Sequence, residues 1–214
     1  PKDAILDEAP GEHSYLFSPP DIQDERSSKR ACRDSSRRTE LWINKSSLNY
    51  FLLPICQELG INLVSVGKRA SNQAVDSLIR RASSPDSAST QVLCLSDLGP
   101  DDLFFCDDLG DEISSRGASD KIEIRRLGLT PEQVIELKLP MYPEGAAGAE
   151  ASADAGIDVS RSKSKEHRSR YKTCLKPHGL NPKHKTELDA LEVYYPGGIS
   201  GFVRDELSSA SGLK

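Results

Sequence analysis

The chain has 214 residues, 36% of them hydrophobic, which is long enough for one sizeable core with tails and short for two full domains. Its formal net charge of −5 excludes the basic balance of a passive nucleic-acid coat, so any contact with nucleic acid is expected to be local or mediated by a metal ion. No apolar run approaches the roughly 20 residues that span a bilayer, and no signal-peptide core opens the sequence.

The five cysteines indicate a reducing environment. Their number is odd, they form no Cys-x-x-Cys pair, and three of them fall within apolar segments. We therefore expect mostly structural thiols in a cytoplasmic protein that does not contact a membrane. Because the sequence begins with Pro1 rather than Met, a processed product or a fragment is also expected.

Residues 1–39 are rich in charge, Ser and Pro, and the basic tract at 26–38 has no apolar periodicity. This composition predicts a flexible charged arm. A solvated linker and a segment that contacts phosphate or a partner are the two interpretations of it.

Four segments predict β-strands. The short apolar runs at 41–43 and 61–66 are typical of strands, and the continuous run at 91–97 indicates a strand buried on both faces of a parallel sheet. The alternating sequence at 121–127 predicts a fourth strand that is half-exposed or at an edge.

Helix signals separate these strands. Apolar residues recur at three- and four-residue spacing from Leu48 to Gly60, which ends the helix, and Pro54 is expected to kink it. Asn72 is expected to cap the next helix, and the capping-box spacing at 130–133 predicts a short one further on.

Because strand and helix signals alternate with short connections, the sequence predicts an α/β fold with a mainly parallel four-stranded sheet and flanking helices at 40–142. Residues 143–185 break the pattern with an Ala- and Gly-rich stretch and a polar basic tract, which predict a flexible low-complexity insertion. Order is expected to return at 186–214 as a small C-terminal helical element.

Carboxylates crowd the end of the strand at 91–97. Ligands of open α/β sheets bind beyond the carboxyl ends of the strands, and carboxylates there commonly hold Mg²⁺. Asp97 is therefore a candidate metal ligand and catalytic residue. Asp101 and Asp102 are candidate ligands as well, although capping of a following helix explains them equally well.

Three basic residues follow the first two predicted strands, namely Lys45, Lys68 and Arg69. They are expected at the same edge of the sheet as Asp97, where they would bind phosphate. Solvation at the surface is an equal alternative.

Four blocks of the sequence resemble a known family. They are LWINKSSLNYFLLPICQELGINLVSVG, VLCLSDLGPDD, RRLGLTPEQVIELKLP and, after the predicted insertion, ELDALE. In this order they are similar to Toprim-like proteins of bacteriophages and prokaryotes, akin to the Toprim part of the topoisomerase VI A subunit. The resemblance covers about residues 40–140 and 186–207. It implies a Toprim-like fold in which acidic side chains meet around Mg²⁺.

Two acidic positions of that family are missing. Asn44 stands at the position of the Toprim glutamate, Gly99 stands at the second aspartate of an Asp-x-Asp pair, and Asp97 is retained. An Asn carbonyl brings no charge and Gly brings no side chain, so weak binding of Mg²⁺ is expected.

The resemblance therefore implies two functions. One is binding of, or metal-dependent action on, the phosphodiesters of DNA or RNA in a phage or mobile-element context, with Asn44 and Asp97 at the catalytic positions. The alternative is a catalytically degenerate module with a structural role, or one that binds a protein partner through residues 1–39 or 143–170.

Overall fold

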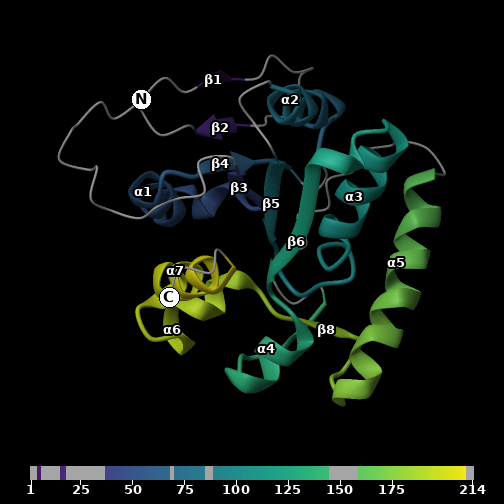
Figure 1. Cartoon of the computed structure of the whole chain (residues 1–214). Helices are drawn as coiled ribbons and strands as arrows, with labels where there is room; N and C mark the ends of the chain where they lie inside the picture. Colours follow the sequence, from purple (N-terminus) through teal and green to yellow (C-terminus); the bar gives the residue numbers. More distant parts are fainter. Residues whose placement is uncertain are drawn as a thin grey trace. The chain divides into compact units, whose positions relative to one another are not determined.

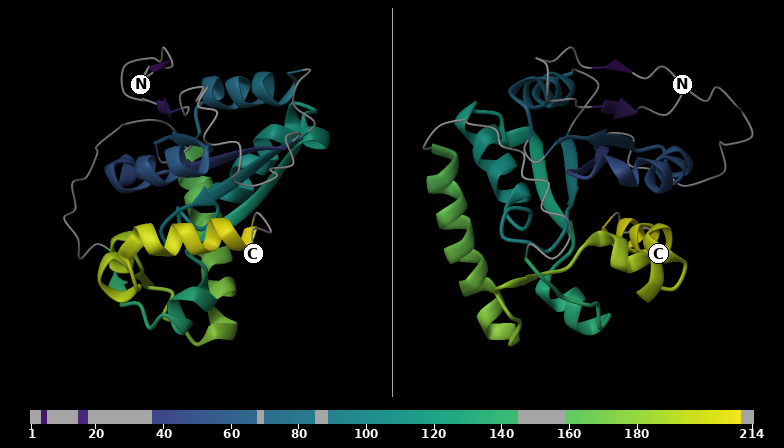
Figure 2. Two further views of the ribbon diagram at one scale, coloured as in Figure 1. Left: turned by 60° about the vertical axis from the view of Figure 1, so that its left-hand side comes forward. Right: turned by 180° about the vertical axis from the view of Figure 1, so that it is seen from behind.

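The computed structural model describes residues 4–5, 15–17, 37–67, 70–84, 89–144 and 159–210. They belong to two compact units. The first unit comprises residues 1–95 and 106–127, and the second comprises 96–105 and 128–214. Figures 1 and 2 show the elements of both units. Most of the predicted N-terminal arm lies outside the described residues.

The first unit is built on a sheet whose strand order is β1-β2-β4-β3-β5-β6. The strands are β1 (Ala4–Ile5), β2 (Tyr15–Phe17), β3 (Arg37–Ile43), β4 (Asn62–Ser65), β5 (Ser89–Leu95) and β6 (Ile122–Gly128). The four strands β4-β3-β5-β6 form an all-parallel sheet. Strand β2 pairs antiparallel with β4, and β1 pairs antiparallel with β2. The predicted α/β fold with a parallel four-stranded sheet and flanking helices is therefore confirmed.

Burial along the strands agrees with their sequence patterns. From Val92 to Leu95, each residue of β5 is at most 1% exposed, as expected for a strand covered on both faces. Strand β6 lies at the edge of the sheet and alternates buried or half-buried with exposed positions between Ile122 and Arg126. The alternation therefore identified the edge strand correctly.

Three α-helices connect the parallel strands. They are α1 (Asn49–Leu59), α2 (Asn72–Ala82) and α3 (Phe105–Ser115), with the short 3₁₀ turns η2 (Ser46–Leu48) and η3 (Ser119–Lys121). The crossover through α1 runs in one direction across the sheet, and those through α2 and α3 run in the other. Right-handed crossovers then place α1 opposite the other two, and Figure 1 shows α1 and α3 on opposite sides of the sheet.

The ends of these helices follow local chemistry. Gly60 adopts a left-handed conformation with φ 63° and ends α1, as predicted, and α1 continues through Pro54. The predicted cap of α2 was one residue off, because Ser71 rather than Asn72 is the N-cap. The Ser71 hydroxyl accepts a hydrogen bond from the N–H of Ala74 at 3.2 Å.

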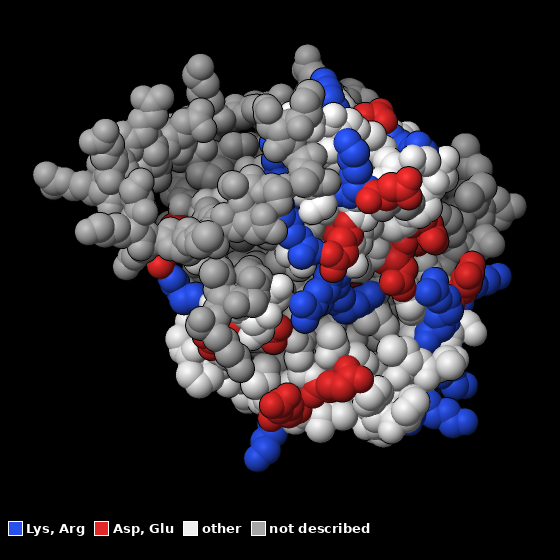
Figure 3. Space-filling view, in the orientation of Figure 1, with Lys and Arg blue, Asp and Glu red and all other residues white. Residues whose placement is uncertain are grey.

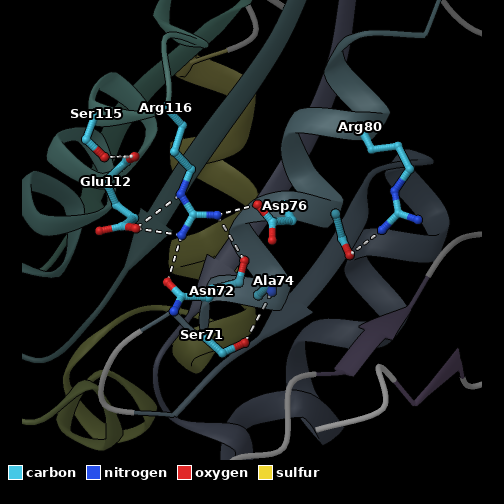
Figure 4. A network of polar contacts seen from close by, with 9 residues as sticks. Ser71, Asn72, Ala74, Asp76, Arg80, Glu112, Ser115 and Arg116 are labelled. Atoms are coloured by element: carbon cyan, nitrogen blue, oxygen red, sulfur yellow. Dashed lines mark hydrogen bonds and ion pairs between the residues drawn. The ribbon is translucent and has the colours of Figure 1, made fainter.

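Asn72 instead joins a network centred on Arg116, shown in Figure 4. Arg116 Nη2 donates to Oδ1 of Asn72 at 2.7 Å and to Oε1 of Glu112 at 2.6 Å. The same guanidinium pairs with Asp76. Arg116 therefore links the C-terminal end of α3 to the first turns of α2, which places both helices on one face of the sheet.

A buried ion pair anchors the other end of α2. Glu40 in β3 has no exposed surface, and its two carboxylate oxygens accept hydrogen bonds from Nε and Nη2 of Arg81 at 2.7 and 2.8 Å. Trp42 Nε1 donates to the same carboxylate at 2.9 Å. The buried charge of Glu40 is thus both paired and hydrogen-bonded.

The second unit contains the C-terminal part of the chain. Its elements are α4 (Pro131–Glu136), β7 (Tyr142–Pro143), α5 (Val159–Leu175), η4 (Lys176–His178), β8 (His184–Lys185), η5 (Leu188–Ala190), α6 (Leu191–Tyr194) and α7 (Gly198–Ala210). Strands β7 and β8 pair antiparallel. The predicted capping box is present, because Thr130 and Gln133 exchange side-chain to backbone hydrogen bonds at 2.9 and 3.2 Å.

Helix α5 lies where the sequence predicted the second part of a flexible insertion at 143–185. His167, Tyr171 and Leu175 recur at four-residue spacing and are 4%, 1% and 0% exposed. This narrow face anchors a helix that is otherwise polar, so no broad hydrophobic pattern marks it in the sequence.

In the described part of the chain, no helix combines the length and the apolar character needed to cross a membrane.

Candidate functional site

The acidic segment that follows β5 is bonded to the segment that precedes α6. Leu98 and Thr186 form an antiparallel β-bridge, with N–H to oxygen distances of 2.9 Å in both directions. One residue earlier in the first segment, the carboxylate Oδ1 of Asp97 accepts a hydrogen bond at 2.8 Å from the N–H of Leu188. Asp97 therefore holds the start of η5, a role that any acceptor of this length can fill.

Tyr171 joins the same two segments to α5. Its hydroxyl donates to the backbone carbonyl oxygens of His184 at 2.7 Å and of Leu98 at 3.2 Å. Burial raises the pKa of the Tyr171 phenol, which therefore keeps its proton and stays a donor. The two segments and α5 thus form one bonded assembly within the second unit.

Asp102 brings a carboxylate to the place where Gly99 has no side chain. A Cβ atom at Gly99 would lie 2.8 Å from Oδ2 of Asp102 and 3.8 Å from Cβ of Lys185. Asp102 is half-buried, whereas Asp101 is exposed. Of these two predicted metal ligands, Asp102 is therefore the one whose carboxylate fills the space beside Gly99.

Lys185 adds a positive charge beside these carboxylates. Its Nζ lies 2.8 Å from Oε1 of Glu187. The hydrogen bond to Glu187 is the main cause that raises the pKa of Lys185, and the charges of Asp97 and Asp102 raise it further. We call Asp97, Asp102, Glu187 and Lys185 the acidic cluster.

The acidic cluster does not fit the Mg²⁺ that the resemblance implies. Mg²⁺ requires near-octahedral oxygen ligands. One oxygen of Asp97 already accepts the Leu188 N–H, and Glu187 is paired with the Lys185 ammonium. Among the described residues, no three His, Cys, Asp or Glu side chains are grouped so that they could hold a metal ion. The positive charge beside these carboxylates is therefore the ammonium group of Lys185.

The remaining predicted site residues lie elsewhere. Asn44 and Lys45 follow β3 in the first unit and are half-buried, and Lys68 and Arg69 lie outside the described residues. Ile43 pairs with Leu95, so the segments that carry Asn44 and Asp97 leave neighbouring strand ends. Because these two residues belong to different units, the shared catalytic site that the resemblance implies for them stays a prediction.

A basic face runs along α5 and into η4. It consists of Lys165, Arg168, Lys172 and Lys176, all of them exposed and spaced three or four residues apart. Arg168 pairs with Glu144 at 2.6 Å. The three lysines form no ion pair with a residue in the described ranges. Figure 3 shows Lys and Arg side chains along the right-hand edge, where Figure 1 draws α5.

Aromatic stacking fixes the opposite flank of α5. The guanidinium carbon of Arg170 lies 4.2 Å from the centre of the Phe104 ring, and the ring of His167 lies 5.0 Å from the same ring. Arg170 is thus engaged with the Phe104 ring and does not belong to the basic face.

Sequence reasoning missed Lys185, Tyr171 and the basic face of α5. Lys185 stands two residues before Glu187, the first residue of the ELDALE block. The charged residues that adjoin this block, which the resemblance includes, were a signal that could have pointed to Lys185. Tyr171 gave no such signal, because its partners are backbone carbonyls that only the fold brings together.

No protein-family model matches this chain, and no curated protein matches it. Its function is therefore inferred from the geometry of its own residues.

Proposed function

We propose that this chain is a catalytically degenerate Toprim-like module that binds the phosphodiester backbone of DNA or RNA through the basic face of α5. The observation that carries this proposal is the series of exposed cations at Lys165, Arg168, Lys172 and Lys176, whose three ammonium groups have no acidic partner in the described ranges. Each cation that contacts a phosphate releases condensed counterions, which favours binding whatever the base sequence.

The overall charge of −5 does not oppose this proposal, because the contact is local. Helix α5 contains six Lys and Arg residues and one Glu. Along the helix axis, Lys165 and Lys176 are separated by 11 positions, which at 1.5 Å per residue is roughly 16 Å. A face of this length can contact several successive phosphates of one strand.

The acidic cluster supports the degenerate part of the proposal. A catalytic Mg²⁺ would have to compete with the Lys185 ammonium and with the Leu188 N–H for the same carboxylates. We therefore assign the cluster a structural role, in which the ancestral acidic segment fastens the C-terminal part of the chain.

Metal-dependent chemistry on phosphodiesters is the second candidate function. The place of Asp102 beside Gly99 favours it, because a second carboxylate then stands near Asp97. In both candidates we place the protein in the cytoplasm, of phage or mobile-element origin. The four described cysteines are free thiols, which supports that location.

The test measures binding of a fluorescent 20-mer, as single strand and as duplex, by anisotropy across a series of salt concentrations. The double variant Lys165→Gln/Lys172→Gln should weaken binding to every sequence and lower the salt slope by about 2, one for each lost phosphate contact. The matched control, Lys121→Gln/Lys138→Gln, removes the same charge from exposed positions outside α5 and should leave the slope unchanged.

An equal loss in both double variants, or no binding by the native chain, would contradict the basic face as the contact. Incubation of the native chain and Asp97→Asn with supercoiled DNA and Mg²⁺ separates the two candidates. Cleavage that depends on Asp97 would replace the degenerate module with the metal-dependent enzyme.

A further inference from the structure

Two thiols that are distant in the sequence meet in the first unit. Cys94 lies in β5 and Cys106 is the second residue of α3, and their side chains are hydrogen-bonded to each other. Cys94 is 1% exposed and Cys106 is half-buried. A small oxidant can therefore reach Cys106, whereas Cys94 lies behind it in the sheet.

A cation with an unused hydrogen bond lies beside these thiols. Arg126 comes from β6, the neighbour of β5, and its Nη1 is buried without a hydrogen-bond partner among the described residues. Its Nη2 lies 3.7 Å from Oδ1 of Asp107. A buried N–H without an acceptor costs free energy, and a thiolate at Cys106 would supply an acceptor and a counter-charge together.

The charges around Cys106 act in this direction. The hydrogen bond from the Cys94 thiol is the largest cause that lowers the pKa of Cys106, and the Arg126 charge lowers it further, against burial and the charge of Asp107. The same hydrogen bond, together with burial, raises the pKa of Cys94. The pair therefore divides into a thiolate-forming residue and a residue that keeps its proton.

We propose that Cys106 and Cys94 form a peroxide-reactive thiol pair, in which Cys106 is the nucleophile and Cys94 is the resolving thiol. This site is independent of the nucleic-acid contact and uses no residue of the acidic cluster. The co-reactant is a hydroperoxide, of which hydrogen peroxide is the simplest.

The reaction has two balanced steps. In the first, the Cys106 sulfur attacks one peroxide oxygen, the O–O bond breaks, and the leaving hydroxide takes the thiol proton to form water. Cys106 is then a sulfenic acid, oxidised by two electrons that the peroxide has gained. In the second, the Cys94 sulfur attacks the Cys106 sulfur, the S–O bond breaks, and water leaves with the Cys94 proton. The product is a disulfide.

The other described thiols provide internal comparisons. Burial raises the pKa of Cys56 to about 12, so this thiol stays protonated and unreactive. Cys174 is half-buried like Cys106 but lies in α5, in the other unit. Cys174 thus matches Cys106 in exposure and differs from it in surroundings.

The experiment exposes the full native chain to hydrogen peroxide, quenches it in denaturant with an alkylating reagent, and maps the peptides by mass spectrometry. A disulfide that links Cys94 to Cys106 should accumulate while Cys56 and Cys174 remain alkylated. In the Cys94→Ser variant, a 1,3-diketone probe should instead trap a sulfenic acid at Cys106. If Cys106 oxidises no faster than Cys174 in the native chain, the proposal is wrong, whether or not the variant folds.

Variants of Arg126 test its part in the site. Arg126→Met removes a charge that lowers the pKa of Cys106, so it should slow the oxidation of Cys106 several-fold relative to the native chain. Arg126→Lys retains the charge and should stay within a few-fold of the native rate. Arg125→Met, at the exposed neighbouring position of β6, should oxidise at the native rate. Equal rates for Arg126→Met and Arg125→Met would remove Arg126 from the site.

Discussion

Asp97 accepts a hydrogen bond at 2.8 Å from the backbone N–H of Leu188, which lies 91 residues further along the chain. The acidic end of the buried strand β5 is therefore engaged in holding the C-terminal part of the fold. Leu188 is fully buried, so its N–H has no access to water if this acceptor is removed. Asp97, which the sequence predicts as a catalytic residue, thus has a structural role that stability measurements can test.

Replacing Asp97 should lower the stability of the fold, and the loss should depend on whether the new side chain can accept the hydrogen bond of the Leu188 N–H. Asp97→Ala leaves the Leu188 N–H without a partner and should lower the free energy of unfolding by about 1–3 kcal/mol. Asp97→Asn keeps a carbonyl oxygen at the same distance from the backbone and should lose less. Urea unfolding of the full chain measures both variants. Equal losses for Ala and Asn would show that the hydrogen bond is not what Asp97 contributes.

Removing Lys185 should open the acidic cluster to a divalent cation. Lys185→Gln takes away the ammonium that pairs with Glu187 and whose pKa the charges of Asp97 and Asp102 raise, so the cluster becomes more negative by one charge. Calorimetric titration with Mn²⁺ should show binding that is several-fold tighter than for the native chain. Lys183→Gln, an exposed lysine two residues away, serves as the matched control. The same affinity in both variants would mean that Lys185 does not occupy the place of a metal ion.

The Glu40 ion pair should contribute far more to stability than a surface pair in the same unit. Glu40 is fully buried, and Glu40→Gln removes the negative charge that pairs with the Arg81 guanidinium. The free energy of unfolding should fall by on the order of 3 kcal/mol. Glu123 pairs with Arg37 at an exposed site, with side chains 60% and 38% exposed, and Glu123→Gln should cost at most about 0.5 kcal/mol. Thermal unfolding of both variants makes the comparison, and similar losses would contradict the ranking by burial.

The elements that the sequence predicted correctly are those whose signals are local. Gly60 ends α1 because a left-handed residue is needed there, and Thr130 and Gln133 cap α4 through bonds three residues apart. Strand β5 is apolar from Val92 to Leu95 because both of its faces are covered there. Ser71 was overlooked as a cap because Asn72, which is equally suited by residue type, stands beside it.

The parts that escaped prediction depend on contacts between distant residues. Helix α5 is held by His167, Tyr171 and Leu175, a face too narrow to give a hydrophobic pattern in a basic segment. The acidic cluster includes Lys185 because the β-bridge of Leu98 with Thr186 brings its segment to Asp97. Pairing of this kind is set by the fold, and no spacing in the sequence reveals it.

Tyr171 should give the protein a measurable sensitivity to alkali. Burial raises the pKa of its phenol in the folded chain, whereas an unfolded tyrosine ionises near pH 10. Below about pH 10 the phenol is protonated in both states, so its full contribution to stability is present. As the pH rises above 10, the tyrosine ionises in the unfolded chain, which lowers the free energy of the unfolded state. The phenol of the folded chain stays protonated, so this contribution to stability is progressively lost.

The variant Tyr171→Phe separates this effect from other titrations. It removes the hydrogen bonds to Leu98 and His184 and should lower the free energy of unfolding by about 1 kcal/mol at pH 8. Between pH 10 and 12, the native chain should lose stability faster than the variant, and the difference between them should shrink. Tyr50→Phe is the control, because the Tyr50 side chain is 84% exposed and the substitution should leave the pH dependence of stability unchanged. A difference between the native chain and Tyr171→Phe that stays constant from pH 8 to pH 12 would show that the Tyr171 phenol ionises as readily in the folded chain as in the unfolded one.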